Sequence, residues 1–160
     1  MINILIISDG DACRSRIAAG LMLSFGRGMH IVTAGVDPES VVADIVGEVM
    51  SERGLEQPVG EPKDVKDIAT HMAEQIANGK SRGADYVIAL TPDAAATAKK
   101  LFTNNKIVNL DFEPRGNSKE SIEELAQEMF RSLFRFYKDT LEEELMPACT
   151  CGANIYCKCH

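Results

Sequence analysis

The sequence predicts an α/β protein in which helices cover a parallel β-sheet. Short aliphatic runs of strand length occur at 2–7, 85–90 and 106–110, and segments whose apolar residues have helical spacing lie between them. The run at 2–7 is aliphatic except for Asn3, which is typical of a strand buried on both faces. Strands that alternate with helices favour a parallel sheet with right-handed crossovers.

Glycine, proline and capping residues mark where the individual elements begin and end. In the first half they delimit a strand at 2–7, a helix that closes at Gly26 and Gly28, a strand at 30–34, a helix at 40–53, and a helix at 64–78 with Asp64 as N-cap. In the second half they delimit a strand at 85–90, a helix that Thr91 and Pro92 open, a strand at 106–110, and a last helix from a capping box of Asn117 and Glu120 to about Met146.

Length and composition indicate one soluble globular domain. The chain has 160 residues, of which 45% are hydrophobic and 26% charged, and its formal net charge is −7. An acidic chain disfavours nucleic acid as a partner, because phosphate contacts need clustered Lys and Arg. No apolar stretch approaches the roughly 20 residues of a membrane span, and the N-terminus has no basic leader. We therefore expect a cytoplasmic protein with no membrane partner.

The segment after the first strand has the form of an anion-binding loop. It reads Ser8-Asp9-Gly10-Asp11-Ala12-Cys13-Arg14-Ser15 and leads straight into a helix. Ligands of open α/β sheets bind at the carboxyl ends of strands, and a helix N-terminus directs N–H groups and its positive dipole end at an anion. Arg14 adds a bidentate fork for phosphate or arsenate oxygens. A phosphate-like anion is therefore the predicted ligand of this loop.

This loop resembles the Cys-x-Gly-Asn-x-Cys-Arg-Ser loop of the low-molecular-weight tyrosine phosphatases and the related arsenate reductases. Gly10, Cys13, Arg14 and Ser15 match it in place, and Thr33-Ala34-Gly35 and the strand at 85–90 extend the similarity over about residues 1–140. The resemblance implies a three-layer, doubly wound α/β fold for a domain at 1–146. It also implies four parallel strands in the order 2-1-3-4.

Ser8 stands where this family has its nucleophilic cysteine, six residues before Arg14. A serine hydroxyl is far less acidic than a loop cysteine and needs an adjacent base, which the loop does not supply. Asp9 and Asp11 add negative charge, and each like-charge pair with a bound anion costs roughly 3–4 kcal/mol before screening. We interpret Ser8 as natural divergence, because one engineered change would not also explain the two aspartates.

Two other groups are candidates for catalysis. Cys13 lies near the predicted helix N-terminus, but the residue six positions on is Ala19 and not arginine, which favours a packing role. The family's general acid is an aspartate before proline after the last strand, where this chain has Asp111-Phe112-Glu113-Pro114. Glu113 fits the position before proline and Asp111 is the nearest aspartate, so both remain candidate acids.

Two activities of the family lack their residues here. Aromatic residues that stack on phosphotyrosine follow the family's acid loop, whereas Arg115 and Gly116 follow it in this chain, which disfavours phosphotyrosine. The thioredoxin-coupled arsenate reductases need two further cysteines after the third strand, and 91–102 contains none. The cysteine relay of those reductases is therefore absent.

The segment 147–160 forms a separate, cysteine-rich tail after Pro147. It contains Cys149, Cys151, Gly152, Tyr156, Cys159 and His160. At these positions it resembles the SEC-C motif, a short zinc-binding tail that docks to protein or ribosomal partners. Thiolate and imidazole ligands suit tetrahedral zinc, and the fourth ligand stays open between Cys157 and His160. The alternative is a redox-labile chain end without metal. The candidate zinc ligands are Cys149, Cys151, Cys157, Cys159 and His160.

Two functional hypotheses follow from these residues. The first is a phosphatase-fold binding module with a degenerate anion loop and little or no classical phosphatase activity. The second is an active phosphomonoester or tyrosine phosphatase with an atypical serine site, in which Ser8, Arg14, Asp111 and Glu113 carry the chemistry. The replacement of the cysteine nucleophile by Ser8 favours the first hypothesis and leaves the enzymatic class open.

Overall fold

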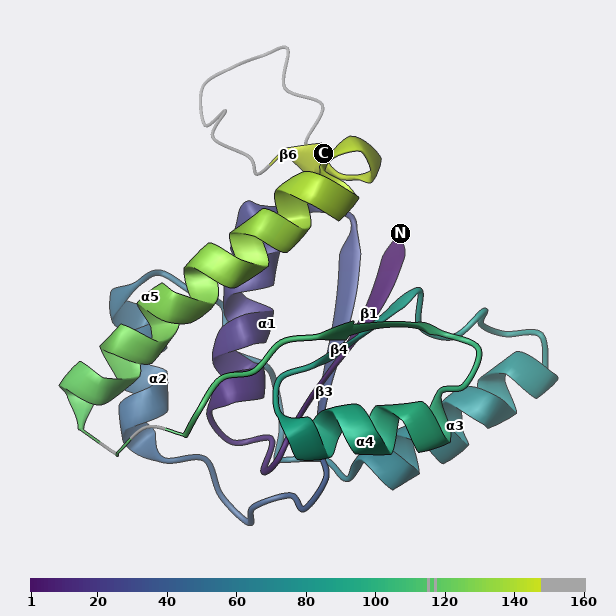
Figure 1. Cartoon of the computed structure of the whole chain (residues 1–160), viewed down its shortest axis with the longest axis horizontal. Coiled ribbons are helices and arrows are strands. Elements are labelled where there is room, and N and C mark those ends of the chain that lie inside the picture. The colour runs from purple at the N-terminus through teal and green to yellow at the C-terminus, as the bar shows by residue number, and fades with distance from the viewer. Residues whose placement is uncertain (115, 117, 148–160) are drawn as a thin grey trace.

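The computed structural model describes residues 1–114, 116 and 118–147 of the chain, without the side chains of 146 and 147. Apart from the short strands at 26–27 and 146–147, its strands and helices follow one another in the order that the sequence predicted (Figure 1). In chain order they are β1 (Ile2–Ser8), α1 (Arg14–Phe25), β2 (Gly26–Arg27), β3 (Met29–Gly35), α2 (Asp44–Glu52), α3 (Val65–Ala77), β4 (Tyr86–Ala89), α4 (Pro92–Leu101), β5 (Lys106–Asn109), α5 (Lys119–Phe136), a π-helical turn (Tyr137–Leu141), a 3₁₀ turn (Glu142–Glu144) and β6 (Met146–Pro147).

The central sheet has four parallel strands in the order β3-β1-β4-β5. This confirms the predicted order 2-1-3-4, once the two-residue strand β2 is set aside. β1 lies inside the sheet and pairs with both β3 and β4, so its carboxyl end is flanked by two strand ends. A loop that leaves β1 therefore starts at the place where ligands of doubly wound sheets bind.

Helices cover both faces of this sheet and produce three layers (Figure 1). Alternate residues of β1 point to opposite faces: Ile4 and Ile6 pack with α1, α2 and α5, whereas Leu5 and Ile7 pack with α3 and α4. All four are at most 1% exposed. The continuous aliphatic run at 4–7 is explained by this burial on both faces.

The structure differs from the sequence prediction at three places. α2 begins at Asp44 and not at 40, and the segment before it is held by amide hydrogen bonds from Val36, Asp37 and Glu39 to the loop after β1. The N-cap of α5 is Ser118, whose hydroxyl accepts from the Ser121 amide at 3.2 Å, and the predicted cap Asn117 lies outside the described residues. The regular α-helix ends at Phe136 and continues as π-helical and 3₁₀ turns.

The antiparallel pair of β2 and β6 was not predicted, because two-residue strands are too short to produce a periodic pattern. It joins the end of α1 to the segment that follows α5. None of the described helices combines the length and the apolar character that crossing a membrane requires.

Gly35 generates the first testable prediction, because a Cβ atom there would lie 2.9 Å from the Asp11 nitrogen and the Gly10 carbonyl carbon. Both are backbone atoms of the loop after β1, and backbone cannot rotate aside as a side chain can. We expect Gly35→Ala to lower the free energy of unfolding in urea by about 1–3 kcal/mol. Gly116→Ala is the control, since its nearest neighbour is the Ser121 hydroxyl at 3.8 Å. Equal losses in the two variants would contradict the prediction.

Candidate functional site

The loop at 8–15 connects the carboxyl end of β1 to the N-terminus of α1. Its backbone is held from one side by the segment that follows β3. Three successive loop carbonyls accept hydrogen bonds from that segment: Ser8 from the Val36 amide (3.0 Å), Asp9 from Asp37 (2.8 Å) and Gly10 from Glu39 (2.9 Å). The N-cap residue of α1, Cys13, makes no side-chain capping bond, so the first turn keeps the open N–H groups of an anion site.

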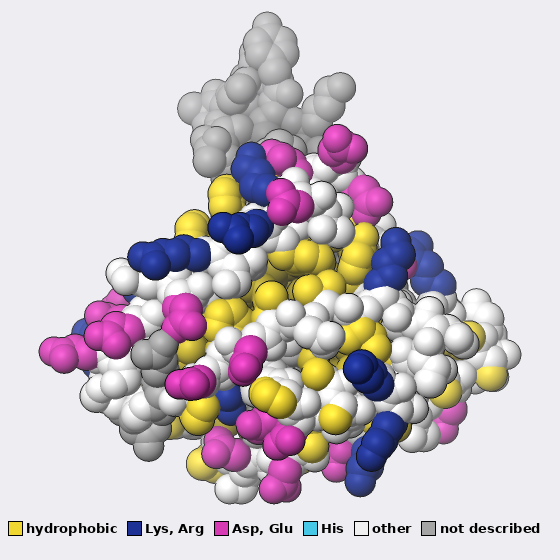
Figure 2. Space-filling model, in the orientation of Figure 1, with side chains coloured by type: hydrophobic (Ala, Val, Ile, Leu, Met, Phe, Trp, Pro, Cys, Tyr) yellow, Lys and Arg dark blue, Asp and Glu magenta, His cyan; other side chains and the backbone are white. Residues whose placement is uncertain are grey.

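A cavity of about 360 Å³ opens beside the loop. Its acidic residues come from the loops after β1 and β3, and its apolar wall comes mainly from α2 and α5. Figure 2 shows that acidic side chains gather on the lower part of the face seen there, over the loops that follow the strands. The lining comprises Ser8, Asp9, Gly10, Ala12, Cys13 and Arg14 of the loop, Asp37 and Glu39, Ala43 and Val46 of α2, Pro114, Gly116, and Ile122 and Leu125 of α5.

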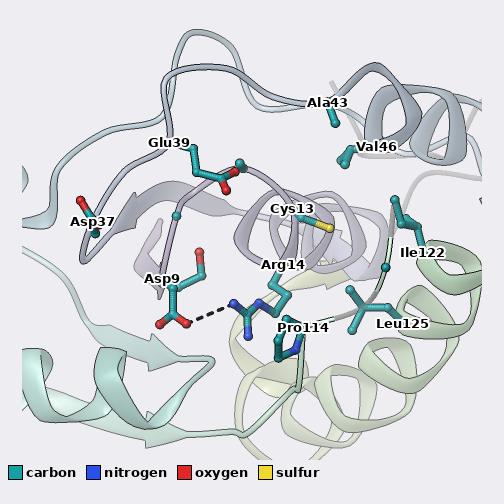
Figure 3. Close-up of a pocket in the computed structure, with 14 residues that line it drawn as sticks. Asp9, Cys13, Arg14, Asp37, Glu39, Ala43, Val46, Pro114, Ile122 and Leu125 are labelled. Carbon is teal, nitrogen blue, oxygen red and sulfur yellow. Dashed lines mark hydrogen bonds and ion pairs between the residues drawn. The ribbon is translucent and has the colours of Figure 1, made fainter. Parts of the chain in front are cut away.

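Arg14, the predicted anion ligand, already has partners for both terminal nitrogens. Nη1 donates to the Phe112 carbonyl at 2.8 Å, and Nη2 donates to Asp9 Oδ2 at 3.2 Å (Figure 3). The other oxygen of Asp9 accepts a hydrogen bond of 2.6 Å from the hydroxyl of Thr91. A carboxylate of the loop itself therefore lies where the guanidinium would otherwise meet an incoming oxyanion.

Asp11 occupies a different environment from Asp9. It is fully buried, and its φ of 51° places it in the left-handed region, which aspartate tolerates better than most residues. Its Oδ1 accepts from the Ser15 hydroxyl at 2.7 Å, and its Oδ2 accepts from the Lys63 amide at 2.8 Å. Asp11 therefore ties the loop to α1 and to the segment before α3, and it does not line the cavity.

Ser8 lines the cavity but is only 2% exposed. Its Oγ accepts a hydrogen bond of 3.1 Å from the Asp11 amide, a backbone donor that cannot remove a proton. In the described part of the chain, no histidine or carboxylate forms a hydrogen bond with this hydroxyl. Activation of a serine nucleophile requires such a base.

Cys13 is a half-buried lining residue of the same cavity. Burial raises the pKa of its thiol, and the effects of Arg14, which lowers this pKa, and of Glu39, which raises it, are smaller. A raised pKa keeps the thiol protonated at neutral pH, and the protonated form is not the nucleophile. Figure 3 shows the sulfur directed toward the apolar wall and away from Asp9.

The segment 111–114, which was predicted to supply a general acid, contributes a backbone carbonyl and a proline to the site and no carboxylate. Asp111 and Glu113 are both exposed, and neither is among the described residues that line the cavity. The carbonyl of Phe112 accepts from Arg14, and Pro114 forms part of the wall. Asp111 and Glu113 are thus sequence neighbours of residues in the site, but their carboxylates do not line the cavity.

Sequence reasoning missed Arg16 and one role of Thr91. Arg16 is 5% exposed, and its guanidinium donates to three carbonyls: Asp11 (2.8 Å), Gly60 (2.9 Å) and Pro58 (3.3 Å). It connects the loop after β1 to the segment after α2. An arginine immediately before the apolar stripe that begins at Ile17 was the available signal. The N-cap role of Thr91 was predicted and is confirmed, but its bond to Asp9 was not foreseen.

No metal centre exists among the described residues, since no three His, Cys, Asp or Glu side chains there lie close enough to hold an ion. The predicted zinc ligands Cys149, Cys151, Cys157, Cys159 and His160 all lie outside the described residues.

Comparison with known proteins identifies relatives by structure. No family model matches the sequence, and none of the curated proteins matches it. The YwlE arginine phosphatase from Geobacillus stearothermophilus matches with a TM-score of 0.69 at 20% identity, over 90% of this chain and 96% of its own. The tyrosine phosphatase Wzb from Escherichia coli K30, solved with sulphate, matches with 0.65 at 16% identity, over 87% and 99%.

Two further structures extend the range of activities. The arsenate reductase from Archaeoglobus fulgidus matches with a TM-score of 0.63 at 15% identity, over 84% of this chain and 98% of its own. A YwlE arginine phosphatase variant, in which serine replaces a cysteine and the active-site serine is phosphorylated, matches with 0.64 at 19% identity, over 86% and 95%.

Asp11 carries the second testable prediction. Asp11→Ala leaves the Ser15 hydroxyl and the Lys63 amide without their acceptor and puts alanine in the left-handed region. We expect a loss of about 2–4 kcal/mol in the free energy of unfolding. Asp11→Asn keeps one carbonyl oxygen and tolerates the same φ, so it should lose less than half as much. Urea unfolding of both variants measures this, and equal losses would contradict it.

The loop after β1 contains Ser8 and an arginine, Arg14, that pairs with Asp9 of the same loop. The chain as a whole has the fold of the low-molecular-weight phosphatases.

Proposed function

We propose that this protein is a phosphatase-fold binding module with a degenerate anion loop and little or no classical phosphatase activity. The observation that carries the proposal is the contact between Asp9 and Arg14, with 3.2 Å between Oδ2 and Nη2. In a phosphoryl-transfer site the arginine must meet the charge that develops on the transferred group. Here a carboxylate of the same loop neutralises that arginine.

The candidate nucleophiles support the same conclusion. Ser8 receives a hydrogen bond from a backbone amide and has no basic partner among the described residues. The Cys13 thiol has a raised pKa and is protonated at neutral pH. Neither group has the activation that attack on a phosphorus atom requires. Binding without turnover is what remains for a loop of this shape.

A phosphate-like anion is the proposed ligand chemistry of the loop. The open N-terminus of α1 and the guanidinium of Arg14 supply donors for such a group. The sulphate complex of the E. coli phosphatase supports this assignment by analogy of fold. The Asp9 carboxylate must be displaced or compensated when the anion binds, so the affinity for a simple oxyanion should be low.

One observation favours the alternative, an active phosphatase with a serine nucleophile. The YwlE variant with a phosphorylated serine indicates that a serine can accept a phosphoryl group in this fold. In that case Ser8 would attack phosphorus, and Asp111 or Glu113 would have to move inward to protonate the leaving oxygen. The exposed positions of both carboxylates argue against this second step.

Hydrolysis of an aryl phosphate by the full-length protein distinguishes the two functions. We expect the wild type to hydrolyse no faster than Ser8→Ala, because neither variant has an activated nucleophile. Ser8→Cys introduces a thiol at the same position and should hydrolyse measurably faster than both. A wild type that matches Ser8→Cys, or a phosphorylated Ser8 caught by mass spectrometry during turnover, would contradict the proposal.

We further propose that the tail at 147–160 binds zinc and docks to a protein or ribosomal partner. The four thiols and the imidazole of this segment match the ligand types that tetrahedral zinc prefers. Such free thiols suit a reducing compartment, so a cytoplasmic location belongs to the same proposal.

Metal analysis tests the tail directly. The full chain purified with zinc should contain about one equivalent of the metal, and a chain that ends at Pro147 should contain none. Cys13 is common to both chains and serves as an internal thiol control. Equal metal content in the two chains would remove the zinc proposal and leave the phosphatase-fold proposal unaffected.

A further inference from the structure

The pair of Asp9 and Arg14 differs from an ordinary surface ion pair in its surroundings. The Arg14 side chain is 12% exposed and the Asp9 side chain is 45% exposed, so the arginine is held in the wall and the carboxylate faces the cavity. Figure 3 shows Asp9 reaching across the mouth of the loop to the guanidinium. A ligand that enters the cavity meets the carboxylate before it meets the arginine.

A simple oxyanion cannot use this site without a penalty. To reach Arg14 it must take the place of the Asp9 carboxylate, which then lies beside the bound anion as a like charge. Asp9 cannot swing far away, because its Oδ1 is held by the Thr91 hydroxyl at 2.6 Å, and Thr91 is itself fixed as the N-cap of α4. Glu39 lies on the same side of the cavity and is also acidic, so it cannot compensate the charge of the bound anion.

A ligand with both charges avoids this penalty. Its oxyanion can pair with Arg14 while a positively charged nitrogen of the same small molecule pairs with the displaced Asp9. One ion pair is then exchanged for two, and the Asp9 carboxylate keeps a partner of opposite charge. The apolar wall of Val46, Ile122 and Leu125 carries no charge, so the acidic side is where such a nitrogen is attracted.

We propose that the cavity selects a zwitterionic ligand, a small phosphate-like group that carries a protonated amine or guanidine, and that Asp9 is the residue that recognises the positive charge. The cavity volume of about 360 Å³ suits a ligand of this size. This inference rests on the proposed function, since it assumes that the loop after β1 is the binding site.

Two ligands that differ only in the positive group test the proposal. 2-Aminoethyl phosphate carries an ammonium group where ethyl phosphate carries a hydrogen, and binding of each to the full chain is measured by calorimetry. We expect the wild type to bind 2-aminoethyl phosphate at least about fivefold more tightly, as for a partly exposed ion pair. In Asp9→Asn this preference should disappear, and ethyl phosphate should bind more tightly than to the wild type.

Asp67→Asn is the charge-matched control. Asp67 is an exposed residue of α3 that does not line this cavity, so its neutralisation should leave the preference within about twofold. Thermal unfolding of each variant shows whether it is folded, and Asp9→Ser is the second variant if Asp9→Asn is not. A preference that survives loss of the Asp9 charge, one that Asp67→Asn abolishes equally, or a wild type that binds neither ligand would overturn the inference.

The hydrolysis assay keeps this outcome separate from that of the proposed function. Turnover of aryl phosphate by the wild type would overturn the non-catalytic proposal whatever the ligand preference is. Absence of turnover together with absence of preference would overturn only the role of Asp9.

Discussion

The loop after β1 depends on the hydrogen bonds that the buried Asp11 side chain accepts. Its two oxygens accept from the Ser15 hydroxyl at the start of α1 and from the Lys63 amide before α3. Its own amide, held in the left-handed region, donates to Ser8. Asp11 thus fixes the local path of the loop between β1 and α1, and its side chain also ties the loop to Lys63, which is 52 residues away. Gly35 completes the arrangement, because only a residue without Cβ permits the approach of the loop backbone.

The two aspartates of the loop have opposite consequences, although they are two positions apart. Asp11 stabilises the loop through its buried hydrogen bonds and does not line the cavity. Asp9 faces the cavity, pairs with Arg14 and decides what that arginine can bind. A loop can therefore keep the backbone of an anion site while its side chains change the charge of the acceptable ligand. This is a case in which a fold is shared and the chemistry of the site has to be argued from its own residues.

The site also shows that a helix terminus suited to an anion can occur without the groups that activate a nucleophile. α1 begins without a side-chain cap, and Arg14 lies in its first turn. What the described residues lack is a base for Ser8, a deprotonated thiol at Cys13 and a carboxylate directed into the cavity from the segment after β5. Each of these is a property of surroundings and not of residue type. Ser8, Asp111 and Glu113 are residue types that can act as nucleophile or general acid, but their surroundings in this structure do not favour these roles.

The sequence by itself determined the α/β fold and the parallel sheet, because strand burial on both faces and helical spacing are patterns of neighbouring residues. The order of the strands followed from the resemblance of the loop after the first strand to the phosphatase family, and not from these local patterns. The sequence also located the loop, since a strand, a glycine-containing turn and a helix start are contiguous. The caps Asp64 and Thr91 were predictable for the same reason. The partners of Asp9, Asp11 and Arg16 were decided only by tertiary structure. Their hydrogen bonds reach Thr91, Lys63 and Gly60, which are tens of residues away, and no local spacing encodes which of two neighbouring carboxylates turns inward.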